Sequence, residues 1–258
     1  MRTAAASNFP VTRCPKCGHV RGAADPSVHA GICPACGIAY AKWGLPRRRR
    51  AHARGAPEPS SGLLERLRAQ LSELPERRDP PSLIARLGLL LLLGLWTLWF
   101  VLHGIDWEII GGSFMHNVNL PFHEFGHLLF APLGHFMAIL GGSLFQLLLP
   151  LGLTAFFVIR QRDNFAAAVT LWWTGQSFVD LAPYIHDAPY RLLPLVGGGG
   201  EESHDWGNLL TLLDALDSSP ALARASFTCG TLLMLLALGW GSRLVYLQHR
   251  ARDATGNV

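Results

Sequence analysis

The stretch NLPFHEFGHLLF, residues 119–130, places two histidines and one glutamate within a run of leucine and phenylalanine. Its centre, His123-Glu124-Phe125-Gly126-His127, fits the pattern H-E-x-x-H. On a helix, side chains four residues apart lie on one face, so both imidazoles can reach a single metal ion. Glu124 is close enough to contact a metal-bound water without ligating the metal. The stretch therefore predicts a helix with a zinc site, in which His123 and His127 are ligands and Glu124 is the general base.

The rest of the sequence is typical of a membrane protein with a soluble N-terminal part. Only 16% of the 258 residues are charged, whereas soluble proteins carry about 25%. Residues 1–82 are rich in Arg, Pro and Ser, and residues 83–247 contain long apolar runs. Ionisable side chains at membrane depth are costly and mark functional sites. This favours a metal site over the alternative, a buried hydrogen-bond network of the same histidines and glutamate.

Four apolar runs are long enough to cross the roughly 30 Å hydrocarbon core of a bilayer. They are residues 83–102, 136–159, 165–185 and 225–247, and residues 114–133 form a fifth, poorer candidate. With the N-terminus in the cytoplasm, five crossings would place the arginines after residues 159 and 247 outside, against the positive-inside tendency. Four crossings with a re-entrant helix at 114–133 would keep them inside. We therefore expect a mainly α, polytopic membrane domain with four to five membrane helices, and we favour the re-entrant arrangement.

Four of the five cysteines form two C-x-x-C-G pairs, with Cys14 and Cys17 in the first and Cys33 and Cys36 in the second. Fifteen residues separate the pairs, a spacing typical of a structural zinc site. Two disulfides are the alternative, but paired C-x-x-C turns favour zinc and hence a reducing, cytosolic compartment. Four thiolates would complete the tetrahedron, so this zinc is expected to be structural.

Residues 46–82 are predicted to link a zinc-binding module at 1–45 to a membrane domain at 83–250. The linker begins with Pro46 and the run Arg47–Arg50. Within it, residues 63–74 show a helical stripe of leucines, which indicates a helix on the membrane surface or one packed on the zinc module. Much of the net charge of +4 lies in the linker, where it favours membrane orientation over nucleic-acid binding.

A catalytic zinc needs a third protein ligand and an open fourth position. Asp180 is the first candidate, because it interrupts an apolar helix and has no adjacent cation. Asp187 and the pair His204-Asp205 are the alternatives. His116 and His135, which flank the motif, are expected to be interface residues rather than ligands.

These features resemble the site-2 protease family of intramembrane zinc metalloproteases, over about residues 115–187. The resemblance rests on H-E-x-x-H in a membrane segment, on LGGSLFQLLLP at 140–150, and on the isolated Asp180. Many members have an Asn where this chain has Gln146, and an Asp-Gly where it has Asp180-Leu. The resemblance implies hydrolysis of a peptide bond in or near the bilayer, with His123, His127 and Asp180 on zinc. Residues 11–43 are similar to the zinc-ribbon family.

The expected protein is thus an integral membrane zinc metallopeptidase of a bacterial plasma membrane, with its ribbon in the cytoplasm. It would hold one catalytic and one structural Zn²⁺. Its partners would be the bilayer, a membrane-protein or peptide substrate, and a protein that contacts the ribbon. Two alternatives remain open: a scaffold with structural metal sites, and a zinc hydrolase acting on a lipid or small amide. A fourth protein ligand, such as His204, would favour the scaffold.

Overall fold

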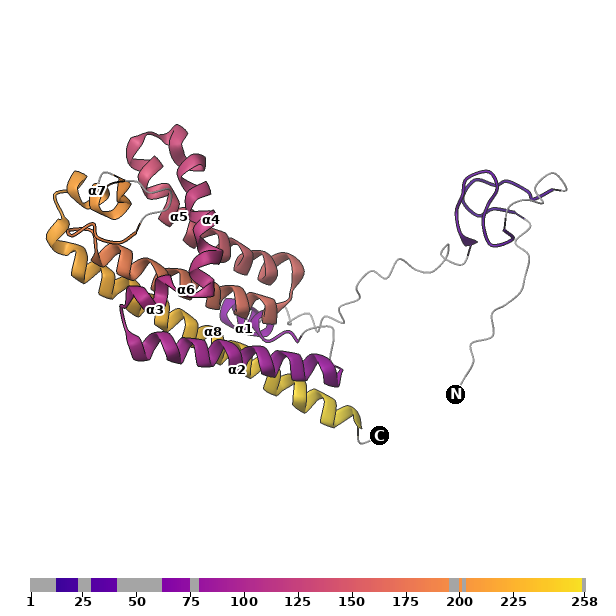
Figure 1. Cartoon of the computed structure of the whole chain (residues 1–258). Helices are drawn as coiled ribbons and strands as arrows, with labels where there is room; N and C mark the ends of the chain where they lie inside the picture. Colours follow the sequence, from indigo (N-terminus) through magenta and orange to yellow (C-terminus); the bar gives the residue numbers. More distant parts are fainter. Residues whose placement is uncertain are drawn as a thin grey trace. The chain divides into compact units, whose positions relative to one another are not determined.

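The computed structural model describes residues 13–22, 29–40, 62–74, 79–194, 200 and 203–256. The chain divides into two units, Met1–Ser60 and Ser61–Val258, and each is described by itself (Figure 1). Of the linker predicted at 46–82, residues 46–61 and 75–78 lie outside the described part. Residues 62–74 belong to the second unit, so the boundary between the units lies before the predicted amphipathic helix.

The described part of the first unit contains two similar turns, one for each cysteine pair. The N–H of Gly18 donates to the carbonyl of Cys14, and the N–H of Gly37 to the carbonyl of Cys33, both at 2.9 Å. Gly18 and Gly37 have φ angles of 75° and 69°, in the left-handed region that favours glycine. One antiparallel bridge flanks each turn: Arg13–Val20 and Ile32–Ala39. The glycine that follows each cysteine pair thus allows the chain to fold back.

The second unit is helical. Its α-helices are α1 (Leu63–Leu71), α2 (Pro80–His103), α3 (Trp107–Gly111), α4 (Phe114–Phe130), α5 (His135–Phe156), α6 (Asn164–His186), α7 (Asp205–Leu212) and α8 (Ser219–Gly256). Shorter segments join or extend them: the 3-10 turns η2 (Ala131–Leu133) and η6 (Leu216–Ser218), and the π-helical turn η3 (Phe157–Gln161). The described chain is therefore mainly α, as the sequence predicts.

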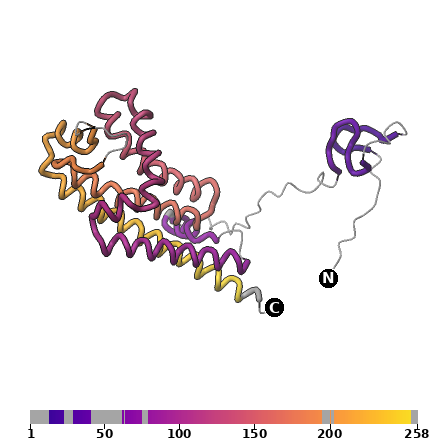
Figure 2. The backbone as a smooth tube through the Cα atoms, in the orientation of Figure 1, coloured from indigo at the N-terminus to yellow at the C-terminus, as the bar shows by residue number. Residues whose placement is uncertain are grey.

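Polar side chains fix where several helices begin. Asp79, Ser113 and Asp163 each accept a hydrogen bond from the backbone N–H three residues later, at the starts of α2, α4 and α6. Such N-caps stabilise a helix by about 1 kcal/mol. At the other end of α4, the turn η2 and Gly134, with a φ of 102°, reverse the chain into α5. The two helices then pack side by side as a hairpin (Figure 2).

Helix α6 is central in this unit and packs most extensively on α8 (Figure 1). Trp172 of α6 shares a core with Phe100 of α2 and Met234 of α8. In the same core, the indole N–H of Trp172 donates to the hydroxyl of Thr97 at 2.8 Å. Neighbouring helices enclose much of α6, so most of its side chains are buried against protein. Polar residues are tolerated there if their hydrogen bonds are made.

Glycine allows α6 and α8 to approach closely. A Cβ atom added to Gly175 would lie 2.6 Å from the carbonyl oxygen of Gly230. A Cβ added to Gly230 would contact the carbonyl oxygen of Gly175 even more closely. Small residues at such crossings let backbones pack against each other in membrane helices. Gly175 and Gly230 therefore set the close spacing of α6 and α8.

Helix α1 is held on the helical unit by backbone carbonyls near its end. The side-chain amide of Asn164 donates to the carbonyl of Gln70 at 2.7 Å, and the indole N–H of Trp240 donates to that of Leu71 at 2.8 Å. Leu64 is 81% exposed, and Leu67 is also exposed. Helix α1 is thus anchored with these leucines outward, and its position on a membrane surface stays a prediction.

Three segments in the described part of the chain are long and apolar enough to cross a membrane: Pro80–His103, His135–Gln161 and Leu216–Asp253. The candidate spans predicted at 83–102, 136–159 and 225–247 are thereby confirmed. The predicted total of four to five is not confirmed within the described residues. Helix α4 has 17 residues, about 25 Å at 1.5 Å per residue and short of a roughly 30 Å core. Helix α6 is long enough but carries several polar side chains.

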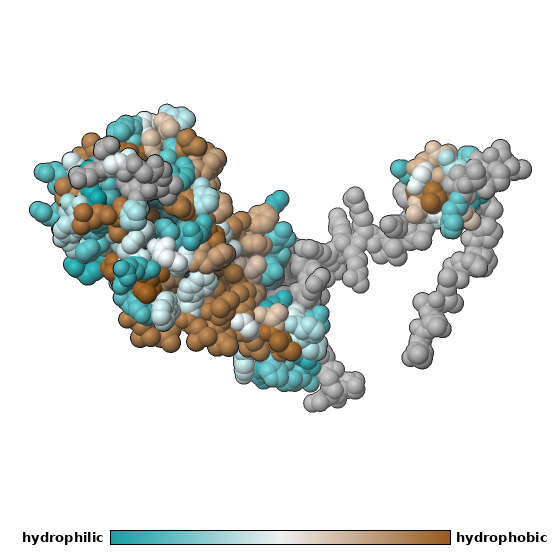
Figure 3. Space-filling model, viewed as in Figure 1, coloured by the Kyte–Doolittle hydropathy of each residue, from teal (hydrophilic) through white to brown (hydrophobic). Residues whose placement is uncertain are grey.

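The outer surface of the helical unit agrees with a lipid environment. Exposed apolar side chains follow α2 along its length: Ile84, Leu87, Leu91, Leu95 and Leu98. The lower side of the unit, along which α2 runs in Figure 1, carries a broad hydrophobic area, brown in Figure 3. A contiguous apolar surface of this kind marks a membrane or protein contact. The described helical unit thus has the properties of an integral membrane protein.

Candidate metal centre

Helix α4 carries the H-E-x-x-H residues as predicted. His123 and His127 lie one turn apart, with ring centroids separated by 4.9 Å. His123 is buried and His127 half-buried, whereas Glu124 is exposed. All three line one cavity. The helix therefore presents two imidazoles and a carboxylate to the same space.

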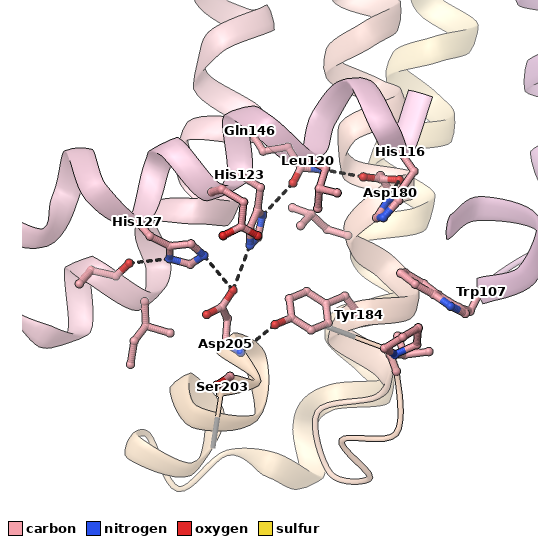
Figure 4. A pocket seen from close by; sticks show the side chains of 16 residues that line it. Trp107, His116, Leu120, His123, His127, Gln146, Asp180, Tyr184, Ser203 and Asp205 are labelled. Atoms are coloured by element: carbon pink, nitrogen blue, oxygen red, sulfur yellow. Dashed lines mark hydrogen bonds and ion pairs between the residues drawn. The ribbon is translucent and has the colours of Figure 1, made fainter. Parts of the chain in front are cut away.

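Asp205, the first residue of α7, completes the cluster. Its Oδ2 lies 3.0 Å from Nε2 of His123 and 3.2 Å from Nε2 of His127 (Figure 4). Ligand atoms of the three residues lie within 4.8 Å of one another, so they could hold one metal ion. The carboxylate comes from 82 residues further along the chain than His123.

The other ring nitrogen of each histidine is engaged by an oxygen. Nδ1 of His123 lies 3.0 Å from Oε1 of Gln146, and Nδ1 of His127 lies 2.8 Å from the carbonyl oxygen of Ala138. An oxygen acceptor requires the proton on Nδ1, which leaves the lone pair of a neutral imidazole on Nε2. Both lone pairs then face the Asp205 carboxylate. Metal-binding histidines are held in the same manner by their second nitrogen.

This donor set fits a tetrahedral metal ion. Bonds of about 2.0 Å to nitrogen and oxygen imply ligand–ligand distances of about 3.3 Å, close to the 3.0 and 3.2 Å observed. An aspartate side chain has an ordinary pKa of about 4, so Asp205 is a carboxylate at neutral pH. Two lone pairs and a carboxylate aimed at one point repel one another unless a cation lies between them.

Glycines of α5 make room for this centre. A Cβ added to Gly142 would lie 2.5 Å from Nε2 of His127 and 2.6 Å from Nε2 of His123. A Cβ added to Gly141 would lie 2.6 Å from the carbonyl oxygen of Gly126, where α4 and α5 cross. Any side chain at residue 142 would thus occupy the space in front of the metal-binding nitrogens. The glycines of LGGSLFQLLLP have a direct structural role beside α4.

The residues before Asp205 fix its position. The N–H of Gly207 donates to Nδ1 of His204 at 2.9 Å, so His204 caps α7. Its proton is then on Nε2, which lies 3.2 Å from the carboxylate of Asp187. Burial lowers the pKa of His204, which favours this neutral form. The N–H of Asp205 itself donates to the hydroxyl of Tyr184 at 2.8 Å (Figure 4).

Asp180, predicted as the third ligand, is not part of the cluster. Its Oδ2 accepts from the side-chain amides of Asn119 at 3.1 Å and Gln146 at 3.0 Å, and its Oδ1 lies 3.1 Å from Nδ1 of His116. The structure places Asp205, one of the alternatives, beside the two histidines, and Asp180 apart from them. Asp180 can be buried there because amide and imidazole donors satisfy a carboxylate as well as a metal does.

The other candidate residues lie outside the cluster of His123, His127 and Asp205. Asp187, which follows α6, and His204, which precedes α7, pair with each other at 3.2 Å. His116 lines the same cavity as the metal centre, held by Asp180. His135 is exposed at the start of α5, outside the cluster.

The centre faces a cavity of about 360 Å³. Apolar residues from α4, α5, α6 and the following loop form much of its lining: Leu120, Ile139, Leu181, Leu193 and Pro194. Glu124, Tyr184 and His116 add polar groups to the same lining. A cavity with apolar walls and a few polar groups is typical of a small-molecule or peptide site.

The four paired cysteines form a second cluster. The Sγ atoms of Cys14 and Cys36 lie 3.7 Å apart, as do those of Cys17 and Cys33. None of these four is in a disulfide, and a tetrahedral zinc with bonds of about 2.3 Å would place its sulfurs about 3.8 Å apart. The four free thiols and their spacing show that the cluster could hold one metal ion.

No protein-family model, curated protein or solved structure matches the chain. Its function is therefore inferred from the geometry of the two clusters and the cavity. Sequence reasoning did not single out Tyr184 or Gly142. Tyr184 gave no spacing signal in the sequence, whereas Gly142 lies in the segment 140–150 on which the family resemblance partly rests.

Proposed function

We propose that the chain is a membrane-embedded zinc metallopeptidase, with His123, His127 and Asp205 as zinc ligands and Glu124 as general base. One observation carries the proposal. Each histidine is fixed by an oxygen on Nδ1, so that both Nε2 atoms face one carboxylate oxygen beside a cavity lined by Glu124. Zinc bound there would acidify a water molecule and polarise a carbonyl group.

The protein's own groups have distinct tasks in this reaction. Glu124 is ionisable, lines the cavity and follows a ligand directly, so it can take a proton from the attacking water and pass it to the leaving amine. Gln146 and the carbonyl of Ala138 hold the two imidazoles in one tautomer. The apolar walls exclude bulk water and accept the apolar side chains of a membrane peptide.

The number of ligands favours catalysis over the scaffold alternative. Within the described residues, the cluster has three protein ligands. His204, the fourth ligand that a closed site would use, pairs with Asp187 instead. Catalytic zinc sites have three protein ligands and an open position, whereas structural sites have four. The cluster of four cysteines fits the structural type, and we assign to it the second zinc of a cytoplasmic ribbon that contacts a protein partner.

The membrane placement follows from the same arrangement. The hairpin of α4 and α5 combines a helix too short to span with one of the three candidate spans, which supports a re-entrant α4. Helix α6 has 23 residues and is enclosed by other helices, so it can serve as a fourth membrane helix despite its polar side chains. The substrate would be a membrane-protein segment, or a peptide close to the plasma membrane of a bacterium.

The first test compares Glu124→Gln with His123→Ala in the full-length protein, purified in detergent. The wild type and Glu124→Gln are expected to hold two zinc ions per chain, and His123→Ala only one, because the ribbon retains its zinc. Cleavage of unfolded β-casein and of a single-span model peptide, followed by mass spectrometry, should fall at least about 100-fold in Glu124→Gln.

Two results would contradict the proposal. If His123→Ala still holds two zinc ions, the metal centre is not formed by these residues. If Glu124→Gln cleaves as fast as the wild type, Glu124 is not the general base. Ala138→Leu tests metal binding and cleavage separately. It keeps the backbone carbonyl that holds His127 but narrows the cavity, so zinc should be retained while cleavage falls.

A further inference from the structure

His123 is connected to two further buried side chains through the nitrogen that does not face Asp205. Nδ1 of His123 lies 3.0 Å from Oε1 of Gln146, and Nε2 of Gln146 donates to Oδ2 of Asp180 at 3.0 Å (Figure 4). His123, Gln146 and Asp180 are 7%, 3% and 5% exposed. A continuous buried chain of polar groups thus leads from the metal centre to Asp180.

The direction of each hydrogen bond in this chain follows from Asp180. An ionised carboxylate only accepts hydrogen bonds. Gln146 must therefore turn its NH₂ group toward Asp180 and its carbonyl oxygen toward His123. That oxygen requires a proton on Nδ1 of His123, which leaves Nε2 free for a metal ion.

Asp180 is itself held from two other sides. The side-chain amide of Asn119 donates to Oδ2 at 3.1 Å, and Nδ1 of His116 lies 3.1 Å from Oδ1. Asn119 is fixed in turn, because its Oδ1 accepts from the indole N–H of Trp173 at 2.8 Å. With several partners, the carboxylate cannot rotate freely, and it provides a fixed end for the chain.

We infer that Asp180 is a positioning residue of the metal centre, which sets the tautomer and orientation of His123 through Gln146. This inference rests on the proposed function, because it assigns a metal ion to His123. It gives Asp180 a role different from the ligand role that the sequence suggested. Outer partners of metal-binding histidines commonly act in this manner on metal affinity.

The test measures zinc affinity in the full-length protein by competition with a chelator, after two zinc ions have been counted in the wild type. Gln146→Met and Asp180→Ala should each weaken the second zinc site by roughly 10–100-fold. Asp180→Asn should stay within about threefold of the wild type, because its amide oxygen can still accept from Gln146. The ribbon zinc serves as an internal reference in every variant.

A double-mutant cycle tests whether Asp180 acts on His123 through Gln146 or independently of Gln146. Once Gln146 is replaced, Asp180 no longer reaches His123, so the double variant should match Gln146→Met within about twofold. Thr97→Val is the control, since it removes the buried acceptor of Trp172 elsewhere in the unit. It should leave the affinity for both zinc ions unchanged.

The outcomes separate this inference from the proposed function. Wild-type zinc affinity in Asp180→Ala, or fully additive losses in the double variant, would overturn the inference alone. A wild type with a single zinc ion would overturn both. The variants could show the predicted zinc affinities while the wild type cleaves neither β-casein nor the model peptide. That result would support the role of Asp180 and contradict the proposed peptidase function.

Discussion

Gly142 shows how closely the candidate metal centre depends on a single residue. The residue lies on α5, and a Cβ atom there would contact Nε2 of both histidines on α4. Its missing side chain creates the space that a metal ion would use. Because the imidazole ends can shift, a methyl group here would displace the ligands rather than unfold the helices. A methyl group at residue 142 should therefore disturb the candidate metal centre more than the packing of the helices.

We expect Gly142→Ala to weaken the second zinc site at least about tenfold, because the new methyl group lies on the metal-binding side of both imidazoles. Zinc titration against a chelator measures this, with circular dichroism to verify the helices. Gly152→Ala is the matched control, since it lies on the same helix and a Cβ there meets nothing within 4 Å. Equal zinc affinity in the two variants would mean that the space at Gly142 is not a metal position.

At the scale of elements, helix α6 organises the helical unit and α7 completes the metal centre. Helix α6 packs on α8 through Gly175 and Gly230, and shares a core with α2. Helix α7 is short, and His204 and Tyr184 hold its first turn. The three side chains of the candidate metal centre therefore come from two helices, and the relative position of these helices depends on α5 and α6. Packing between these helices should control both stability and metal affinity.

Gly230→Ala should lower the free energy of unfolding of the helical unit by about 1–3 kcal/mol, because α6 and α8 must separate to admit the methyl group. Gly239→Ala, also on α8, has nothing within 4 Å of the added Cβ and should be neutral or slightly stabilising. Denaturation in mixed SDS micelles, followed by tryptophan fluorescence, measures both. The packing argument would be refuted by equal stability of the two variants.

At the scale of the whole molecule, two units carry two separate clusters of metal-binding residues. The cysteine cluster lies in Met1–Ser60, and the histidine–aspartate cluster lies in Ser61–Val258. Each cluster draws all its ligands from one unit. The two sites should therefore bind metal independently of each other.

Cys33→Ser is expected to remove the zinc of the ribbon and to leave the histidine–aspartate site with wild-type affinity. Unfolding of the helical unit should change by less than about 0.5 kcal/mol, as for sites without shared contacts. Metal analysis and SDS denaturation check the two statements, and Ser60→Ala provides a control in the same unit. A loss of both zinc ions in Cys33→Ser would show that the second centre depends on the first.

The sequence by itself determined the features that depend on local spacing. Four-residue periodicity places His123 and His127 on one face of α4, cysteine spacing brings four thiols together, and apolar runs mark three candidate spans. Only the tertiary structure placed Asp205, rather than Asp180, beside the two histidines. An isolated carboxylate in an apolar helix indicates that it has partners, but which partners it finds depends on how α4, α5 and α6 pack. Burial by neighbouring helices likewise explains why α6 carries polar residues that a lipid-facing helix would avoid.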